Sequence, residues 1–217
     1  MSIFGFSKSQ MVAPDNALPG RATPVLPHPA PHAVLGTSMT GPWPDGTAVL
    51  YVAMGCFWGA EELYWRLPGI VTTSAGYMGG FTPNPTYEEV CTGRTGQTES
   101  VLVAYDPDTI STYDILKAFW ENHDPTQGYR QGNDTGTQYR SAIYYTTDEQ
   151  RELIDRTGDS YSEVIRARGY DDITTEIAPA GSTTYYLAED YHQQYLYKNP
   201  NGYRCHANTG LALPALV

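Results

Sequence analysis

The sequence has 217 residues, with 13 Lys and Arg against 24 Asp and Glu, so its formal net charge is −11, and this length fits one domain or one domain with a tail. The negative charge disfavours binding to nucleic acid or to an anionic membrane, because phosphates would be repelled, and no run of 18 apolar residues predicts a membrane span. Three cysteines are too few for a disulfide scaffold and odd in number, so we expect a reducing, cytoplasmic environment.

The chain begins with a proline-rich segment. Eight of the 16 prolines precede residue 48, whereas all 18 tyrosines follow residue 50. Each proline removes a backbone donor and restricts the residue before it, so this stretch cannot hold a helix, and it has no apolar stretch typical of a secretory signal. We expect residues 1–45 to form an extended arm, either wrapped on the domain or partly mobile. Residues 46–217 then form the folded domain, with an irregular tail at 200–217.

From residue 47 on, apolar periodicity predicts alternating strands and helices. Strands are expected at 48–54, 70–77, 100–105, 142–145 and 173–177. Helices are expected from 57 to the Leu67-Pro68-Gly69 stop, from the cap Ser111 to 123, from the cap Thr147 to 169, and over 188–199. This alternation predicts an α/β or α+β fold with helices layered on a mixed sheet, whose strand order the pattern alone does not give.

Cys56 lies where the first buried strand passes into a helix. Unpaired N–H groups and the positive end of the helix dipole stabilise a thiolate at such a position. Gly55 and Gly59, on either side, permit tight backbone geometry and the close approach of a ligand. By position alone, a cysteine that packs as a small buried hydrophobe is an equally good interpretation.

At this turn the sequence becomes specific. The segment GCFWGAEELYWRLPGI resembles the active-site signature of the peptide methionine sulfoxide reductase A family. The resemblance continues through GYMGGFTPNPTYEEVCTGRTGQTESV, FWENHDPTQ, GNDTGTQYRSAIYY and AEDYHQQYLYKNPNGY, in the family's order, from about residue 48 to 206. It implies an α+β two-layer sandwich with a mixed β-sheet, of the ferredoxin-like α-β plait type. It also implies thiol-dependent reduction of methionine S-sulfoxide, free or within peptides.

The resemblance assigns a role to each reacting group. Cys56 is the nucleophile that attacks the sulfoxide sulfur and becomes a sulfenic acid. Glu99 is the acid, kept neutral by burial, that protonates the departing oxygen, and Tyr87 and Tyr139 are phenol donors that support it. Asp134 belongs to the polar groups that orient the site. Without the resemblance, a solvated carboxylate, packing tyrosines and an Asx turn would explain these four residues.

Other residues of the same motifs are expected to bind the substrate by apolar contact or to have a structural role. Phe57 and Trp58 are expected to bind the S-methyl group by apolar contact. Cys91 matches a position at which the family often has a non-essential cysteine, so packing is expected, with reserve redox use as the alternative. His123 and His192 match family residues that are buried and hydrogen-bonded.

The second half-reaction needs another thiol. The resemblance assigns it to Cys205, which attacks the sulfenic acid and forms a Cys56–Cys205 disulfide. Because the tail after Pro200 is small, polar or irregular, we expect little packing there and a dependence on motion. Arg204 or His206 lowers the pKa of the Cys205 thiol in one interpretation, and a surface ion pair is the alternative. Thioredoxin, a glutaredoxin-like protein or a low-molecular-weight thiol would then restore the dithiol.

The sequence carries no signal for a bound cofactor, and two other functions remain as alternatives. The sequence has no CxxC spacing, so we expect no metal site. It has no GxGxxG motif or P-loop, so we expect no nucleotide cofactor. We expect a monomer without nucleic-acid or membrane partners. A cysteine hydrolase would use Cys56 with His123 or His192 as base, and requires an imidazole within hydrogen-bond reach of the sulfur. A non-enzymatic module with a tyrosine-lined peptide groove would instead keep all its function in Cys56→Ser.

Overall fold

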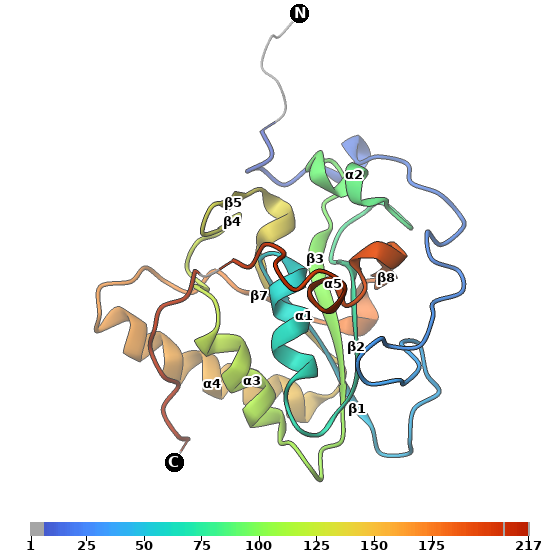
Figure 1. Cartoon of the computed structure of the whole chain (residues 1–217). Coiled ribbons are helices and arrows are strands. Elements are labelled where there is room, and N and C mark those ends of the chain that lie inside the picture. Colours follow the sequence, from blue (N-terminus) through green and yellow to red (C-terminus); the bar gives the residue numbers. More distant parts are fainter. Residues whose placement is uncertain (1–6, 206, 217) are drawn as a thin grey trace, which may run out of the picture.

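The computed structural model describes residues 7–205 and 207–216. Its centre is a six-stranded sheet in the order β7-β6-β1-β3-β2-β8 (Figure 1). The strands are β1 Ala48–Met54, β2 Ile70–Met78, β3 Thr98–Tyr105, β6 Ser141–Tyr145, β7 Glu176–Pro179 and β8 Tyr186–Leu187, and β4 Arg130–Gln131 pairs with β5 Asp134–Thr135 in a separate hairpin. Neighbouring strands in the large sheet run antiparallel, apart from the parallel pair β6 and β7. The fold is therefore α+β with a mostly antiparallel, mixed sheet.

The helices gather on one face of this sheet. They are α1 Phe57–Trp65, α3 Thr112–Glu121 and α4 Asp148–Arg166, with the short helices α2 Tyr87–Cys91 and α5 Tyr195–Lys198 nearer the edges. Side chains alternate along a strand, so Leu50 and Val52 of β1 pack in the main core with the three long helices, whereas Ala53 packs on the opposite face with Tyr144. The helices thus form one layer and the sheet the other.

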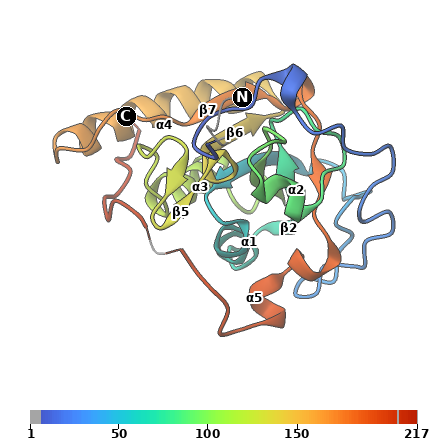
Figure 2. The ribbon, with the colours of Figure 1, turned by 90° about the horizontal axis from the view of Figure 1, so that it is seen from above.

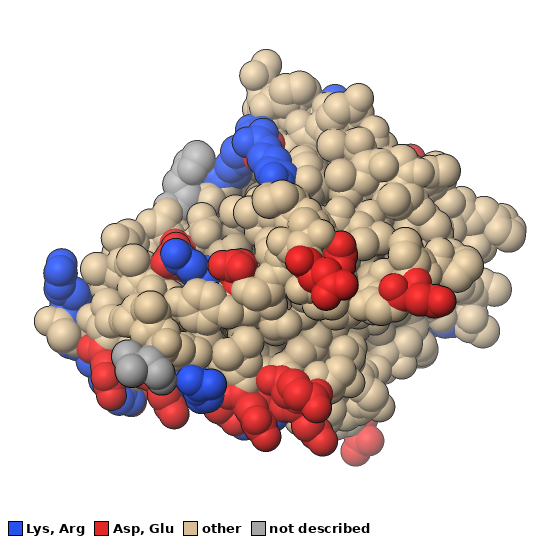
Figure 3. Space-filling view, turned by 90° about the horizontal axis from the view of Figure 1, so that it is seen from below, with Lys and Arg blue, Asp and Glu red and all other residues tan. Residues whose placement is uncertain are grey.

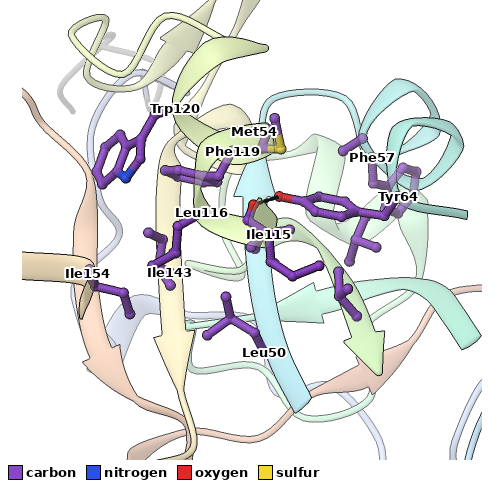
Figure 4. Packing of buried hydrophobic residues seen from close by; sticks show 14 of the residues in the cluster. Leu50, Met54, Phe57, Tyr64, Ile115, Leu116, Phe119, Trp120, Ile143 and Ile154 are labelled. Carbon is purple, nitrogen blue, oxygen red and sulfur yellow. Dashed lines mark hydrogen bonds between the residues drawn. The ribbon is translucent and has the colours of Figure 1, made fainter. Parts of the chain in front are cut away.

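The main core lies between these two layers. Figure 4 shows Leu50 and Ile143 of the sheet facing Leu116 of α3 and Ile154 of α4. Two buried aromatic side chains of this core, Trp120 and Tyr64, have hydrogen-bond partners for their polar groups. The Trp120 indole donates to Thr157 Oγ1 at 3.0 Å, and the Tyr64 hydroxyl donates to the Ile115 carbonyl at 3.2 Å.

The proline-rich arm lies along the domain. In Figure 2 the blue chain runs past α2 and around the side of the sheet. The Leu18 N–H donates to the Arg94 carbonyl at 2.9 Å, Arg21 pairs with Glu89 at 2.9 Å, and the His32 ring is hydrogen-bonded to Thr73 at 2.9 Å. These contacts join the described part of the arm to the domain at three separate places.

Most local predictions are confirmed, and two are wrong. Ser111 and Thr147 cap α3 and α4 as expected. The expected last strand at 173–177 begins only at Glu176, and β8 follows it. The expected helix at 188–199 breaks into a 3₁₀ turn and α5, because Gln194 between them is left-handed, with φ of 46°. Buried Glu61 holds that conformation by accepting hydrogen bonds from the Gln194 backbone and side-chain N–H groups, both at 2.8 Å.

The C-terminal tail corrects a further expectation. Its described residues form no helix or strand, but they are docked rather than loosely packed. Leu213 is buried and its N–H donates to the Glu121 carboxylate at 2.8 Å, while the Tyr113 hydroxyl donates to the Pro214 carbonyl at 3.1 Å. The partners lie about 90 to 100 positions earlier in the chain, which is why local periodicity did not reveal them.

On the face of the molecule seen from below, charged side chains are spread rather than gathered in one patch. Seen from below, acidic side chains form several separate groups, and basic side chains are scattered between them and at the edges (Figure 3). In the part of the chain that the structure describes, no helix has the length and apolar character needed to cross a bilayer.

Candidate active site

The turn between β1 and α1 buries Cys56. Cys56 is the N-cap residue of α1 and is 9% exposed. Gly55 before it has φ of 86°, and a Cβ there would lie 2.6 Å from the Gln131 side chain. Only glycine fits both conditions. Gly59, which the sequence also suggested for close approach, meets no atom within 4 Å of its would-be Cβ, so sterics do not require a glycine there.

Burial decides the charge state of the Cys56 thiol. Its pKa is raised well above the ordinary value, chiefly by burial and next by the charge of Glu99, while a hydrogen bond from the Trp58 N–H lowers it. The expected stabilisation of a thiolate at the helix start therefore exists, but it is outweighed because desolvation penalises the anion more strongly. The resting residue is a protonated thiol at neutral pH.

Glu99 is a buried carboxyl on β3. It is 1% exposed, and burial raises its pKa to about 8. Hydrogen bonds from the Phe57 N–H at 3.0 Å and from the Gln138 amide at 3.2 Å act in the opposite direction. Because the effect of burial on the pKa exceeds that of the hydrogen bonds, Glu99 is mostly protonated at pH 7 and can donate a proton.

Two phenols and a second carboxyl surround this pair. Tyr87 begins α2, Tyr139 ends the 3₁₀ turn after β5, and Asp134 lies in β5. The pKa of each phenol is raised first by burial and then by the charge of Glu99, so both remain proton donors. Burial also raises the pKa of Asp134, against a hydrogen bond from Tyr203.

Aromatic rings form a wall beside the thiol. Trp58 stacks on Tyr195 with ring centroids 3.8 Å apart and an interplanar angle of 13°, and its indole N–H donates to His192 Nδ1 at 3.0 Å. Phe57 is 1% exposed and packs against Tyr77 and His192. Trp58 is thus the more accessible of the two residues expected to bind the S-methyl group, and Phe57 supports it from within the core.

Sequence reasoning missed several supporting residues. Gln138 donates to Glu99 and also to the Cys91 sulfur at 3.6 Å. Glu189 accepts hydrogen bonds from the Tyr77 hydroxyl at 3.0 Å and from the Tyr87 N–H at 2.8 Å, and so fixes the start of α2. Both residues stand within the motifs quoted above, but their partners lie far away in sequence. The one local signal was Thr86 with Glu89, a capping box that predicts α2.

His123 and His192, the two bases of the hydrolase alternative, make no hydrogen bond to Cys56 in the part of the chain that the structure describes. His123 uses both ring nitrogens elsewhere, with the Phe119 carbonyl at 2.7 Å and the Ser141 hydroxyl at 2.8 Å. His192 accepts from Trp58 through Nδ1. Burial lowers the pKa of both imidazoles to about 4. The hydrolase alternative therefore lacks the thiol–imidazole pair that it requires.

Cys205 of the C-terminal tail lies at the same site as Cys56. Cys56 and Cys205 line one cavity of about 350 Å³, and all three cysteines are free thiols. The Cys205 thiol donates to the Gln131 carbonyl at 3.6 Å. Arg204 forms an ion pair, as one interpretation expects, but its partner is not a surface carboxylate, because the Glu62 side chain is only 11% exposed; His206 lies outside the described residues.

No metal centre is evident among residues 7–205 and 207–216, where no group of three or more His, Cys, Asp or Glu side chains gathers. His28 and His32 stand four positions apart in the arm, but the His32 ring accepts from the Val34 N–H at 3.1 Å through Nδ1 and bonds Thr73 through Nε2.

Comparison with known proteins agrees with this geometry. Residues 48–216 match the family model described as peptide methionine sulfoxide reductase. The chain is 60% identical to the peptide methionine sulfoxide reductase MsrA of Salinispora tropica, covering 97% of this chain and 96% of that protein. It is 56% identical to MsrA 1 of Caulobacter vibrioides, covering 94% and 93%.

Solved structures give the same result. Methionine sulfoxide reductase A of Corynebacterium diphtheriae superposes with a TM-score of 0.83 at 51% identity, covering 95% of this chain and 100% of that one. Mxr1 of Saccharomyces cerevisiae in reduced form has a TM-score of 0.66 at 35% identity, covering 76% and 93%. This chain therefore belongs to the peptide methionine sulfoxide reductase A family.

Proposed function

We propose that this protein reduces methionine S-sulfoxide, free and within oxidised proteins, to methionine, with Cys56 as the nucleophile. The observation that carries the proposal is the pairing of a buried thiol at a helix start with a buried carboxyl whose pKa is about 8. A soft nucleophile for sulfur and a proton donor for oxygen are what sulfoxide reduction requires. Membership of the family supports the same reaction.

In the first step the Cys56 thiol loses its proton to solvent and the thiolate attacks the sulfoxide sulfur. Glu99 gives its proton to the sulfoxide oxygen, and Tyr87, Tyr139 and Asp134 orient that oxygen. Attack forms a bond between the Cys56 sulfur and the substrate sulfur; the protonated oxygen then passes from the substrate sulfur to the Cys56 sulfur, which breaks the S–O bond of the substrate and the bond between the two sulfurs, so methionine leaves and Cys56 becomes a sulfenic acid. The substrate sulfur is reduced by two electrons and Cys56 is oxidised by two, and Glu99 regains a proton from solvent.

In the second step Cys205 resolves the sulfenic acid. Its sulfur attacks the Cys56 sulfur, an S–S bond forms, the S–OH bond breaks and water leaves. A dithiol, or two equivalents of a monothiol, then returns both cysteines to thiols by exchange and is itself oxidised to a disulfide. Thioredoxin, a glutaredoxin-like protein or a low-molecular-weight thiol has the required chemistry.

Substrate choice rests on the aromatic wall. Trp58 and Phe57 would bind the S-methyl group, which is common to free and peptide-bound methionine sulfoxide. The fixed direction from this wall to Glu99 favours one configuration at sulfur, and the family resemblance makes it S.

We further propose the finer architecture and setting. The order β6-β1-β3-β2, with α1 after β1 and α3 after β3, supports a ferredoxin-like α-β plait at the centre. Residues 1–45 would be an arm on a catalytic domain of residues 46–217, whose tail carries Cys205. Three free thiols support a reducing, cytoplasmic location, and a monomer suffices because every proposed group comes from one chain.

The test is NMR of racemic methionine sulfoxide with enzyme and dithiothreitol. We expect the S epimer to disappear while the R epimer persists, and Cys56→Ser to remove the activity by a factor of about 10³ or more. The matched control is Cys91→Ser, which removes another thiol near the site and should retain turnover. Consumption of both epimers at equal rates, or residual turnover in Cys56→Ser above a few parts per thousand, would contradict the proposal.

A further inference from the structure

An ion-pair cluster joins the tail to the helix that carries Cys56. The Glu62 side chain on α1 is 11% exposed. The Arg204 guanidinium donates two hydrogen bonds to its carboxylate, from Nε to Oε2 at 2.6 Å and from Nη2 to Oε1 at 2.9 Å. Arg66, one turn along α1, also reaches Glu62 Oε1 at 2.7 Å, but its side chain is 69% exposed. A bidentate contact to a largely buried carboxylate is geometrically more specific than a single exposed pair.

Arg204 also organises the tail itself. Its Nη1 donates to the Pro200 carbonyl at 2.9 Å and to the Gly202 carbonyl at 3.3 Å. The one guanidinium therefore folds the turn that leads out of α5 and fastens that turn to α1. A lysine at this position has a single point of charge and cannot make the same fork of contacts.

The position of this cluster connects it with the two sulfurs. Arg204 directly precedes Cys205, and both ion-pair residues line the cavity that Cys56 and Cys205 share. Figure 2 shows the tail running from α5 toward the β4–β5 hairpin, beside the start of α1. Two single hydrogen bonds also involve side chains of this stretch: the Tyr203 hydroxyl donates to Asp134 at 3.1 Å, and the Cys205 thiol donates to the Gln131 carbonyl at 3.6 Å.

We propose that Glu62 and Arg204 form a latch that holds Cys205 beside Cys56 and speeds formation of their disulfide. The proposal rests on the function proposed above, in which Cys205 resolves the Cys56 sulfenic acid. Holding the attacking thiol near its target raises its effective concentration without altering the bonds made and broken. Arg204 and Glu62 are thus positioning residues for the second step and take no part in the first.

The experiment separates the two steps by rapid mixing of reduced enzyme with methionine S-sulfoxide. Methionine release reports the first step, and trapping of the sulfenic acid with a dimedone-type probe at successive times reports its lifetime. In Arg204→Ala and in Glu62→Gln we expect methionine release within about twofold of wild type. Disulfide formation should be slower by about three- to tenfold, the scale of a partly buried bidentate ion pair.

Arg66→Ala is the matched control, because it removes a cation from the same carboxylate without touching the tail, and it should resolve the sulfenic acid at the wild-type rate. Added salt gives a second readout. Screening should slow resolution in wild type and leave Arg204→Ala unchanged, a response that a general packing defect would not produce. Arg204→Lys, which keeps the charge and loses the fork, should fall between wild type and Arg204→Ala.

Wild-type resolution rates in Arg204→Ala and Arg204→Lys would overturn the latch. Equal slowing in Arg66→Ala would also overturn it, because the effect would then follow the charge at Glu62 rather than the tail. If wild-type enzyme released methionine but formed no Cys56–Cys205 disulfide, the proposed function would fail instead, so the two failures are distinguishable.

Discussion

The Glu99→Gln substitution removes the proposed acid while keeping the size of the side chain. A glutamine amide can still accept the Phe57 N–H through its oxygen, and the Gln138 amide can turn to meet the new NH₂ group, so the local hydrogen bonds are largely replaced. What is lost is a donor that burial keeps protonated at neutral pH. General acid catalysis contributes about 10²- to 10⁴-fold, so we expect methionine release at pH 7 to slow by at least about 10²-fold.

The pH profile sharpens this prediction. The step needs Glu99 protonated and Cys56 as thiolate, and the pKa of Cys56 lies well above its ordinary value whereas that of Glu99 is about 8. The reactive form has lost one proton relative to the fully protonated pair, so it is a constant fraction of all pairs that have lost one proton. The rate of methionine release therefore follows the loss of that first proton. The once-deprotonated pair makes up about one tenth of the enzyme at pH 7, about half at pH 8 and about nine tenths at pH 9 for a pKa of about 8.

Methionine release by wild type should thus rise about fivefold from pH 7 to pH 8 and less than twofold from pH 8 to pH 9. In Glu99→Gln the break near pH 8 should vanish, because the remaining titration belongs to the Cys56 thiol. Quenched single-turnover assays between pH 6 and pH 9.5 measure both effects. Glu88→Gln, which changes an exposed carboxyl next to Tyr87 in the sequence, is the control and should keep the wild-type profile. A rate in Glu99→Gln within about threefold of wild type, or a break that stays near pH 8, would refute the reasoning.

Two further predictions concern groups around the thiol. The double variant Tyr87→Phe with Tyr139→Phe removes both phenol donors. It should slow single-turnover methionine release more than either single variant does, and a double variant at the wild-type rate would exclude the phenols from oxygen binding. Tyr195→Ala removes the ring that stacks on Trp58; it should raise KM for free methionine sulfoxide by about three- to tenfold with a smaller change in kcat, since an aromatic pair contributes about 0.5–1.5 kcal/mol. An unchanged KM would show that the stack does not shape the pocket.

Local sequence patterns predicted the central part of the fold. The apolar run of β1, the caps Ser111 and Thr147, and the stop after α1 depend on residues within a few positions of one another, and the structure places all of them as expected. The break at Gln194 was not predictable in this way. It depends on Glu61, 133 positions earlier, whose buried carboxyl competes with helical hydrogen bonding.

In the candidate site, too, local sequence patterns indicated some features, whereas others depend on contacts between distant residues. A reactive or a buried cysteine was equally compatible with the position of Cys56, and only the family resemblance singled out Glu99 among the acidic residues. The raised pKa of Cys56 shows why local reasoning fell short, since the helix-start effect is visible in sequence but the degree of burial is not. The contacts of Gln138 and Arg204 likewise join residues 39 and 142 positions apart.

The central claim is that one methionine is produced as Cys56 is oxidised and then bridged to Cys205. It is tested most directly by treating reduced enzyme with one equivalent of methionine S-sulfoxide, counting the methionine released, and mapping the cysteine peptides without reductant. We predict one methionine per enzyme and a Cys56–Cys205 disulfide, with the Cys91 thiol still free. In Cys205→Ser the same methionine should appear, and the Cys56 sulfenic acid should remain for the probe to trap. Methionine formed while Cys56 stays a free thiol, or a Cys56–Cys91 bridge as the sole product, would contradict the account.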